Sequence, residues 1–80
     1  MEKDFNLYQH LIKMVDNQIE SGTPKATGET YQRLLTQGYD DSTAKEKIAA
    51  IIAEEIYAMM MSEDKKLDEV RFSEKLSMIE

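Results

Sequence analysis

Eighty residues without a cysteine are enough for one small domain, but they offer no disulfide and no cysteine ligand for zinc. Sixteen acidic residues against ten basic ones give a net charge of −6, which disfavours binding to nucleic acid and to anionic membranes. No segment has the long apolar stretch of a signal peptide or of a membrane span. We therefore expect a cytoplasmic protein whose partners are other proteins.

Four segments space their apolar side chains at intervals of three and four residues, which is typical of helices. We expect helices over residues 4–21, 24–37, 42–62 and 68–79, packed as one all-α domain, a compact four-helix bundle. Gly22 and Pro24 separate the first two helices. The apolar stripe of the first helix consists of Phe5, Tyr8, Leu11, Ile12, Val15 and Ile19.

The second and third helices are separated by a glycine and a cluster of polar residues. Gly38 is well placed to end the second helix in a left-handed conformation, and Asp40, Asp41 or Ser42 then caps the third. The third helix is the longest and most apolar, so we expect it at the centre of the core. Its apolar face consists of Ala44, Ile48, Ile51, Ile52, Ile56, Met59 and Met60. The buried faces of the second and fourth helices are Tyr31, Leu34 and Leu35, and Phe72, Leu76 and Ile79.

No combination of residues indicates catalysis or a bound cofactor. His10 is the only histidine, and we expect it on the surface rather than in a metal or catalytic site. The three glycines form no phosphate-binding motif, and no serine lies in a nucleophile elbow. Glu54 and Glu55 lack the Glu-x-x-His pattern of di-metal bundles, so we expect a solvated face there. We expect no enzyme activity, no metal and no cofactor.

The methionine cluster near the end of the third helix is the strongest candidate for a contact surface. Met59, Met60 and Met61 are consecutive and cannot all point into one core, so at least one should face outward beside Tyr57. Methionine-rich surfaces adapt to different partners, although core packing with one exposed methionine is the alternative. A homodimer formed here would help a chain whose own core is thin.

Asn17 and Gln18 form a polar pair inside the first helix, where asparagine is a poor helix former. We expect both amides to be buried and to hydrogen-bond the turn over residues 22–24, holding the first helix against the second. A ligand-binding role for this pair is the alternative.

The segment over residues 35–48 resembles two known motifs. As a helix-turn-helix, its recognition helix would present two carboxylates to phosphates, which disfavours DNA binding. As a ubiquitin-associated module, it would bind peptides through Gly38 and Tyr39, with Ala44 early in the next helix. Gln37 stands where that family usually has methionine before the glycine.

Five short segments together resemble a small bacterial all-helical family of unknown function. They are VDNQ, a G-x-P turn, T-x-x-R-L, E-I-Y and D-E-x-R-F, where the family has V-E-N-Q and D-E-x-R-[YF] at the two ends. The matching positions are Val15, Asn17, Gln18, Gly22, Pro24, Arg33, Leu34, Gly38, Ala44, Ile48, Glu55, Ile56, Asp68, Glu69, Arg71 and Phe72.

This chain lacks the histidines that members of that family often carry. The resemblance places two of them, one helical turn apart, at Ser42 and Glu46. It implies a helical fold and no established activity. The sequence therefore favours a non-catalytic interaction or accessory module, with a peptide-binding module and a degenerate metal-binding or enzyme-derived domain as alternatives.

Overall fold

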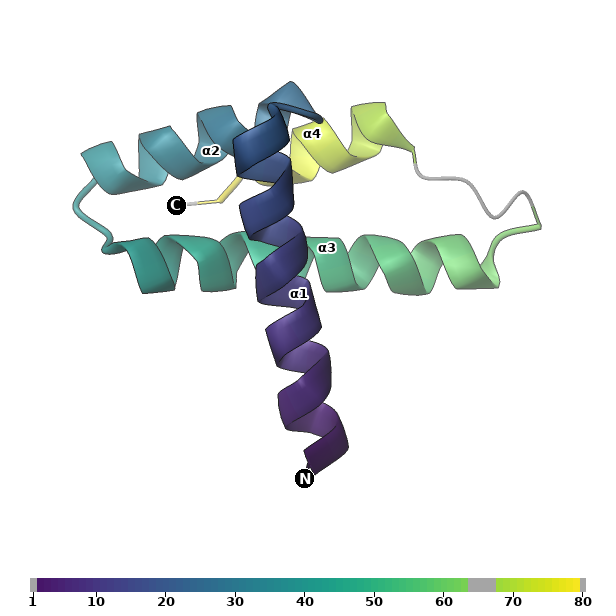
Figure 1. The fold of residues 1–80 in the computed structure, drawn as a ribbon. Helices are drawn as coiled ribbons and strands as arrows, with labels where there is room; N and C mark the ends of the chain where they lie inside the picture. The colour runs from purple at the N-terminus through teal and green to yellow at the C-terminus, as the bar shows by residue number, and fades with distance from the viewer. Residues whose placement is uncertain (1, 64–67, 80) are drawn as a thin grey trace.

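The computed structural model describes residues 2–63 and 68–79, with side chains from residue 7 onward. The regular structure in these ranges is entirely helical (Figure 1), which confirms the expected all-α class. The helices are α1 (Glu2–Ser21), α2 (Lys25–Thr36), α3 (Asp41–Met61) and α4 (Glu69–Ser77). Their ends differ from the predicted ones by at most two residues. Phe5 of the predicted α1 stripe lies outside the described side chains.

The helices α2 and α3 form the centre of the fold, and α1 and α4 each pack against both of them. Figure 1 shows α2 and α4 along the same side of α3, while α1 crosses near the middle of α3 and extends beyond the other helices toward its N-terminal end. The expected central position of α3 is confirmed, because α3 contacts each of the other helices. The helix α2 also contacts the other three, a role that its sequence did not indicate.

Each helix contributes at least one side chain to a single buried core. The core residues are Leu11, Val15, Leu34, Ala44, Ile48, Ala49, Ile52, Phe72 and Leu76. All except Ala49 belong to the predicted apolar faces. The expectation that Met60 belongs to the buried face of α3 is wrong, because this residue is 62% exposed.

The turn between α2 and α3 has the geometry that its residues predict. Gly38 has a φ of 105° and donates from its N–H to Leu35 O at 3.0 Å, while the Tyr39 N–H donates to Leu34 O at 3.1 Å. These two bonds form a Schellman motif, which satisfies the last carbonyls of α2. Of the three candidate caps, Asp40 is the one used, and its Oδ1 accepts from the Thr43 N–H at 2.8 Å.

Arg33 fastens the end of α4 to α2. Its Nη1 donates to Ile79 O at 2.7 Å and its Nη2 donates to Leu76 O at 2.8 Å. The carbonyls in the last turn of a helix have no partner within the helix, and a guanidinium offers several donors in a planar fork. Arg33 therefore satisfies the Leu76 carbonyl in the last turn of α4 and the Ile79 carbonyl just beyond it, and so joins the end of α4 to α2.

Candidate functional site

The methionine cluster is divided between the surface and the interior. Tyr57 is 67% exposed and Met61 is 72% exposed, and Met60 also faces outward. Met59 is partly buried. The structure therefore places three of the four predicted contact residues on the surface at the C-terminal end of α3.

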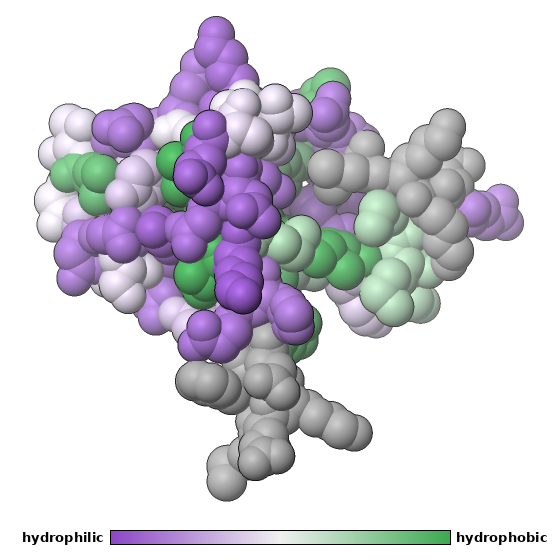
Figure 2. Space-filling view, in the orientation of Figure 1, coloured by the Kyte–Doolittle hydropathy of each residue, from purple (hydrophilic) through white to green (hydrophobic). Residues whose placement is uncertain are grey.

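A larger apolar surface continues from this cluster onto α1. Leu7 and Met14 are seven residues apart, so they share one face of α1, and both are exposed. On α3, Ile56, Met59 and Met60 are three and four residues apart and share a face as well. We call these five residues the apolar corner. Figure 2 shows apolar side chains gathered beside the hydrophilic outer face of α1, over the C-terminal half of α3.

An apolar pocket of about 130 Å³ opens at the apolar corner. Its walls include Met14 and Gln18 from α1, Ile52, Ile56 and Met59 from α3, and Phe72 from α4. An engineered apolar cavity of about 150 Å³ binds benzene, so this pocket has room for a single apolar side chain. Sequence periodicity did not predict the pocket, because it depends on how α1 crosses α3.

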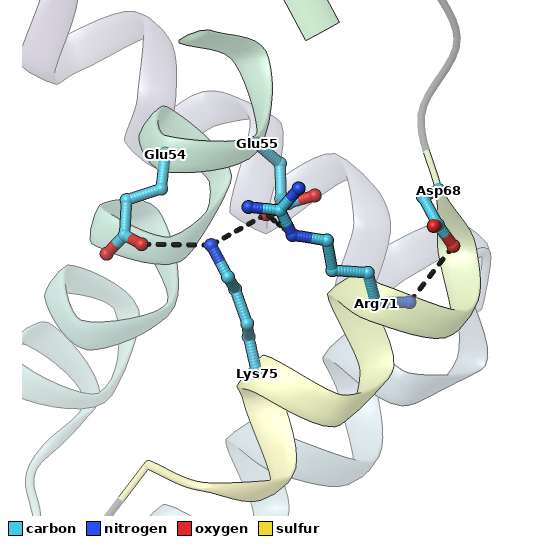
Figure 3. A network of polar contacts seen from close by, with 5 residues as sticks. All are labelled: Glu54, Glu55, Asp68, Arg71 and Lys75. Atoms are coloured by element: carbon cyan, nitrogen blue, oxygen red, sulfur yellow. Dashed lines mark hydrogen bonds and ion pairs between the residues drawn. The ribbon is translucent and has the colours of Figure 1, made fainter. Parts of the chain in front are cut away.

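Glu55 lies in the wall of the same pocket and is 3% exposed, so the expectation that it faces water is wrong. Its Oε2 lies 3.0 Å from Lys75 Nζ and 3.6 Å from Arg71 Nε, both on α4 (Figure 3). Both contacts are ion pairs by distance, but among the described residues none has the geometry of a hydrogen bond to Glu55 Oε2. Two cations from α4 thus compensate the buried carboxylate. Sequence periodicity could not predict these ion pairs, because Arg71 and Lys75 lie far from Glu55 in the sequence.

Lys75 joins Glu55 to the neighbouring Glu54, which is exposed. Its Nζ also donates to Glu54 Oε1 at 3.1 Å. The Glu55 carboxylate, with a further contribution from Glu54, raises the pKa of the Lys75 ammonium above its ordinary value. Lys75 therefore stays charged at neutral pH and holds α4 on α3.

A second polar cluster holds α1 against the N-terminal half of α3. Lys45 Nζ lies 2.7 Å from Asp16 Oδ1 and 3.1 Å from Asp41 Oδ1, and the Tyr31 hydroxyl donates to that Asp41 oxygen at 2.6 Å. The Asp16 carboxylate raises the pKa of Lys45, and Asp41 adds to this effect. A lysine kept protonated in this way is neither a base nor a nucleophile. The cluster is consistent with a structural role.

The Tyr8 hydroxyl adds a further link between α1 and α3. It donates to Glu46 Oε1 at 2.9 Å. Glu46 and the exposed Ser42 occupy the positions where the family resemblance places histidines. Glu46 therefore takes part in a contact between helices.

Only one of the two expected amides bridges α1 and α2. Gln18 is partly buried, and its Oε1 accepts from the Thr27 hydroxyl at 2.8 Å. The bond thus reaches α2 itself rather than the turn over residues 22–24. Asn17 is exposed, so the expectation of a buried pair is wrong for this residue. One helical position separates the two side chains by about 100°, which turns Asn17 away from α2.

The remaining candidate residues are Gly38 and Tyr39, proposed for peptide binding, and the single histidine His10. Gly38 forms the turn described above, and Tyr39 packs against the core. The Tyr39 ring also lies beneath Lys47, whose Nζ is 4.8 Å from the ring centroid. His10 is exposed, in agreement with the expectation of a surface position.

Residues 2–63 and 68–79 contain no group of three or more histidine, aspartate or glutamate side chains arranged to hold a metal ion. No helix within them combines the length and the apolar composition that crossing a membrane requires. Comparison of the chain with known protein families, with curated proteins and with solved structures finds no significant match.

Proposed function

We propose that this protein is a non-catalytic interaction module of the cytoplasm. Its contact surface is the apolar corner together with Tyr57 and Met61. The observation that carries the proposal is an open apolar pocket next to exposed apolar side chains, in a chain with a net charge of −6. The exposed side chains are Leu7, Met14, Tyr57, Met60 and Met61. Contiguous exposed apolar surface with a pocket is typical of sites that bind another protein.

The side chains of the apolar corner suit a protein partner. Methionine is unbranched and polarizable, so Met14, Met59 and Met60 adapt to different apolar surfaces. The pocket between α1, α3 and α4 then accepts one apolar side chain as an anchor. Membership of the small bacterial helical family is part of this proposal and adds no activity to it.

The buried and paired charges support a structural role rather than catalysis. Lys45 and Lys75 each contact two carboxylates, and both have a raised pKa. Catalytic lysines need the opposite shift, toward the neutral amine. These charges instead join α1 and α4 to α3 and so shape the apolar corner between them.

Site-specific photo-crosslinking tests the contact surface. A photoreactive phenylalanine derivative replaces Tyr57 in cells that produce the protein naturally, and the same derivative replaces the exposed Gln32 on α2 as a control. We expect an adduct of one defined mass from position 57 and none from position 32. The adduct should disappear in a Met60→Glu background that keeps its helix content by circular dichroism. Equal adducts at both positions, no adduct at position 57, or an adduct unaffected by Met60→Glu would overturn the proposal.

A further inference from the structure

We infer that the side chain which anchors a partner in the apolar pocket is the neutral phenol of a tyrosine, with its hydroxyl bound to the Glu55 carboxylate. The inference rests on the proposed contact surface and names the group that its pocket recognises. Three observations carry it: the volume and lining of the pocket, the buried carboxylate among the lining residues, and the charges around that carboxylate.

The pocket has the size and the lining for one aromatic ring. Its volume of about 130 Å³ is close to that of the engineered cavity that holds benzene, so it suits a single ring better than the two-ring indole of tryptophan. Met14, Met59 and Phe72 belong to its lining. Thioether sulfur and aromatic rings both make favourable contacts with a further aromatic ring, which favours an aromatic anchor over an aliphatic one.

The burial of the lining residues places a polar group at the floor of the pocket. Ile52, Glu55 and Phe72 are buried, whereas Met14 is exposed and Met59 is partly buried. A side chain that enters past the two methionines therefore meets the carboxylate with its far end. Tyrosine carries a hydrogen-bond donor at that end of its ring, and phenylalanine does not.

The Glu55 carboxylate has acceptor capacity that its neighbours leave unused. Lys75 and Arg71 contact its Oε2 as ion pairs, but among the described residues no donor has hydrogen-bond geometry to this oxygen (Figure 3). An ionised carboxylate has two oxygens that can together accept about four hydrogen bonds. A phenol hydroxyl supplies one of these bonds. A phenylalanine ring would keep water away from the carboxylate and supply none, which is unfavourable.

The charges around Glu55 favour a neutral donor over a lysine or an arginine of the partner. Lys75 contacts both Glu54 and Glu55, and Arg71 contacts Glu55. These two carboxylates and two cations carry no net charge. A further cation in the pocket would approach Lys75 and Arg71, and like charges brought together at an interface oppose binding. A phenol donates its hydrogen bond without this repulsion.

Two analogues of side chains test the preference on the full chain. The compound p-cresol corresponds to the tyrosine side chain and toluene to that of phenylalanine, so they differ by one hydroxyl. Methyl NMR during titration should show saturable shifts at Met14, Ile52 and Met59 with p-cresol. We expect p-cresol to bind about tenfold more tightly than toluene, because its hydroxyl donates to a charged acceptor. Equal binding, tighter binding of toluene, or p-cresol shifts confined to other residues would overturn the inference.

Matched variants assign the preference to Glu55. Glu55→Met combined with Lys75→Met removes the acceptor together with its cation and leaves an apolar floor. We expect this variant to bind p-cresol no more tightly than toluene. Glu54→Gln, which alters the exposed neighbour, should keep the tenfold preference. A preference that survives in the double variant would overturn the role of Glu55, and the comparison on the unaltered chain decides the inference if the double variant does not fold.

The photo-crosslinking result at position 57 separates this inference from the proposed contact surface. An adduct at position 57 together with equal binding of the two analogues would keep the contact surface and reject the tyrosine anchor. A preference for p-cresol without any adduct at position 57 would reject the contact surface, and with it the tyrosine of a partner, in favour of a site for a free phenol.

Discussion

Single hydrogen bonds at buried positions hold the crossing helices in place. Thr27 is fully buried, and its hydroxyl donates to the Gln18 amide across the α1–α2 contact. Removal of one partner leaves the other polar group poorly satisfied, which costs more than the bond itself contributes. The position of α1, and with it the shape of the apolar corner, depends on such contacts.

Thr27→Val tests this bond, because valine keeps the shape and removes the hydroxyl. We expect a loss of about 1 kcal/mol in the free energy of unfolding, measured by urea denaturation. Thr36→Val is the control, since its exposed hydroxyl bonds only the Gln32 carbonyl of its own helix at 3.0 Å. The control should change stability by less than about 0.5 kcal/mol. Equal effects of the two substitutions would show that the Gln18–Thr27 bond does not fasten α1 to α2.

At the scale of the elements, two glycines in open surroundings have opposite roles. A Cβ atom added at Gly28 or at Gly38 would meet nothing within 4 Å. Gly38 has a positive φ of 105° after the end of α2, whereas Gly28 lies inside α2. The effect of adding a side chain at these two glycines therefore differs only through the backbone conformation, because neither position is crowded.

Gly38→Ala should destabilise the protein by about 1–2 kcal/mol, because a side chain is strained at positive φ. Gly28→Ala should stabilise it by about 0.5–1 kcal/mol, because alanine is the better helix former. Thermal unfolding followed by circular dichroism gives both values. Stabilisation by Gly38→Ala would contradict the left-handed end of α2.

The attachment of α4 depends on the charges around Glu55. Lys75→Met leaves the buried carboxylate with Arg71 as its neighbouring cation, at 3.6 Å. We expect a clear drop in the urea midpoint, and partial recovery when Glu55→Met is added, because two apolar side chains replace a buried pair well. Glu54→Gln is the control and should have little effect, since Glu54 is exposed. A double variant less stable than Lys75→Met would show that the ion pair does not govern this contact.

Sequence periodicity predicted the elements of this fold more fully than their contacts. The apolar spacing gave four helices, and Gly38 with Asp40 gave the α2–α3 turn, because these signals are local in the chain. The pairing of Glu55 with Lys75 spans 20 residues, so no local pattern revealed it. The exposure of Met60 is a property of tertiary packing, and the spacing of apolar residues along α3 does not determine it.

On the scale of the whole molecule, the cross-helix polar contacts predict a loss of stability at high pH. Paired carboxylates raise the pKa of Lys45 and Lys75, and hydrogen bonds to Asp41 and Glu46 raise the pKa of the hydroxyls of Tyr31 and Tyr8. A group whose pKa is raised by folding contributes its full stabilisation below its unfolded pKa and loses it as the pH rises through the folded one.

The free energy of unfolding should therefore fall as the pH rises above about 10, where unfolded lysine and tyrosine begin to lose protons. Urea denaturation between neutral pH and about pH 11 measures this change. Lys45→Met should make the dependence shallower, whereas Lys25→Met, which alters an exposed lysine in the first turn of α2, should not. Stability that stays constant across this range would contradict the role given to these contacts.

The apolar corner is the feature of the whole molecule on which the functional account depends. Photo-crosslinking from position 57 tests it most directly, with the exposed position 32 on α2 as the control. We predict an adduct of one defined mass from position 57, lost in the Met60→Glu background, and none from position 32. No adduct from position 57, or an equal adduct from position 32, would contradict the account.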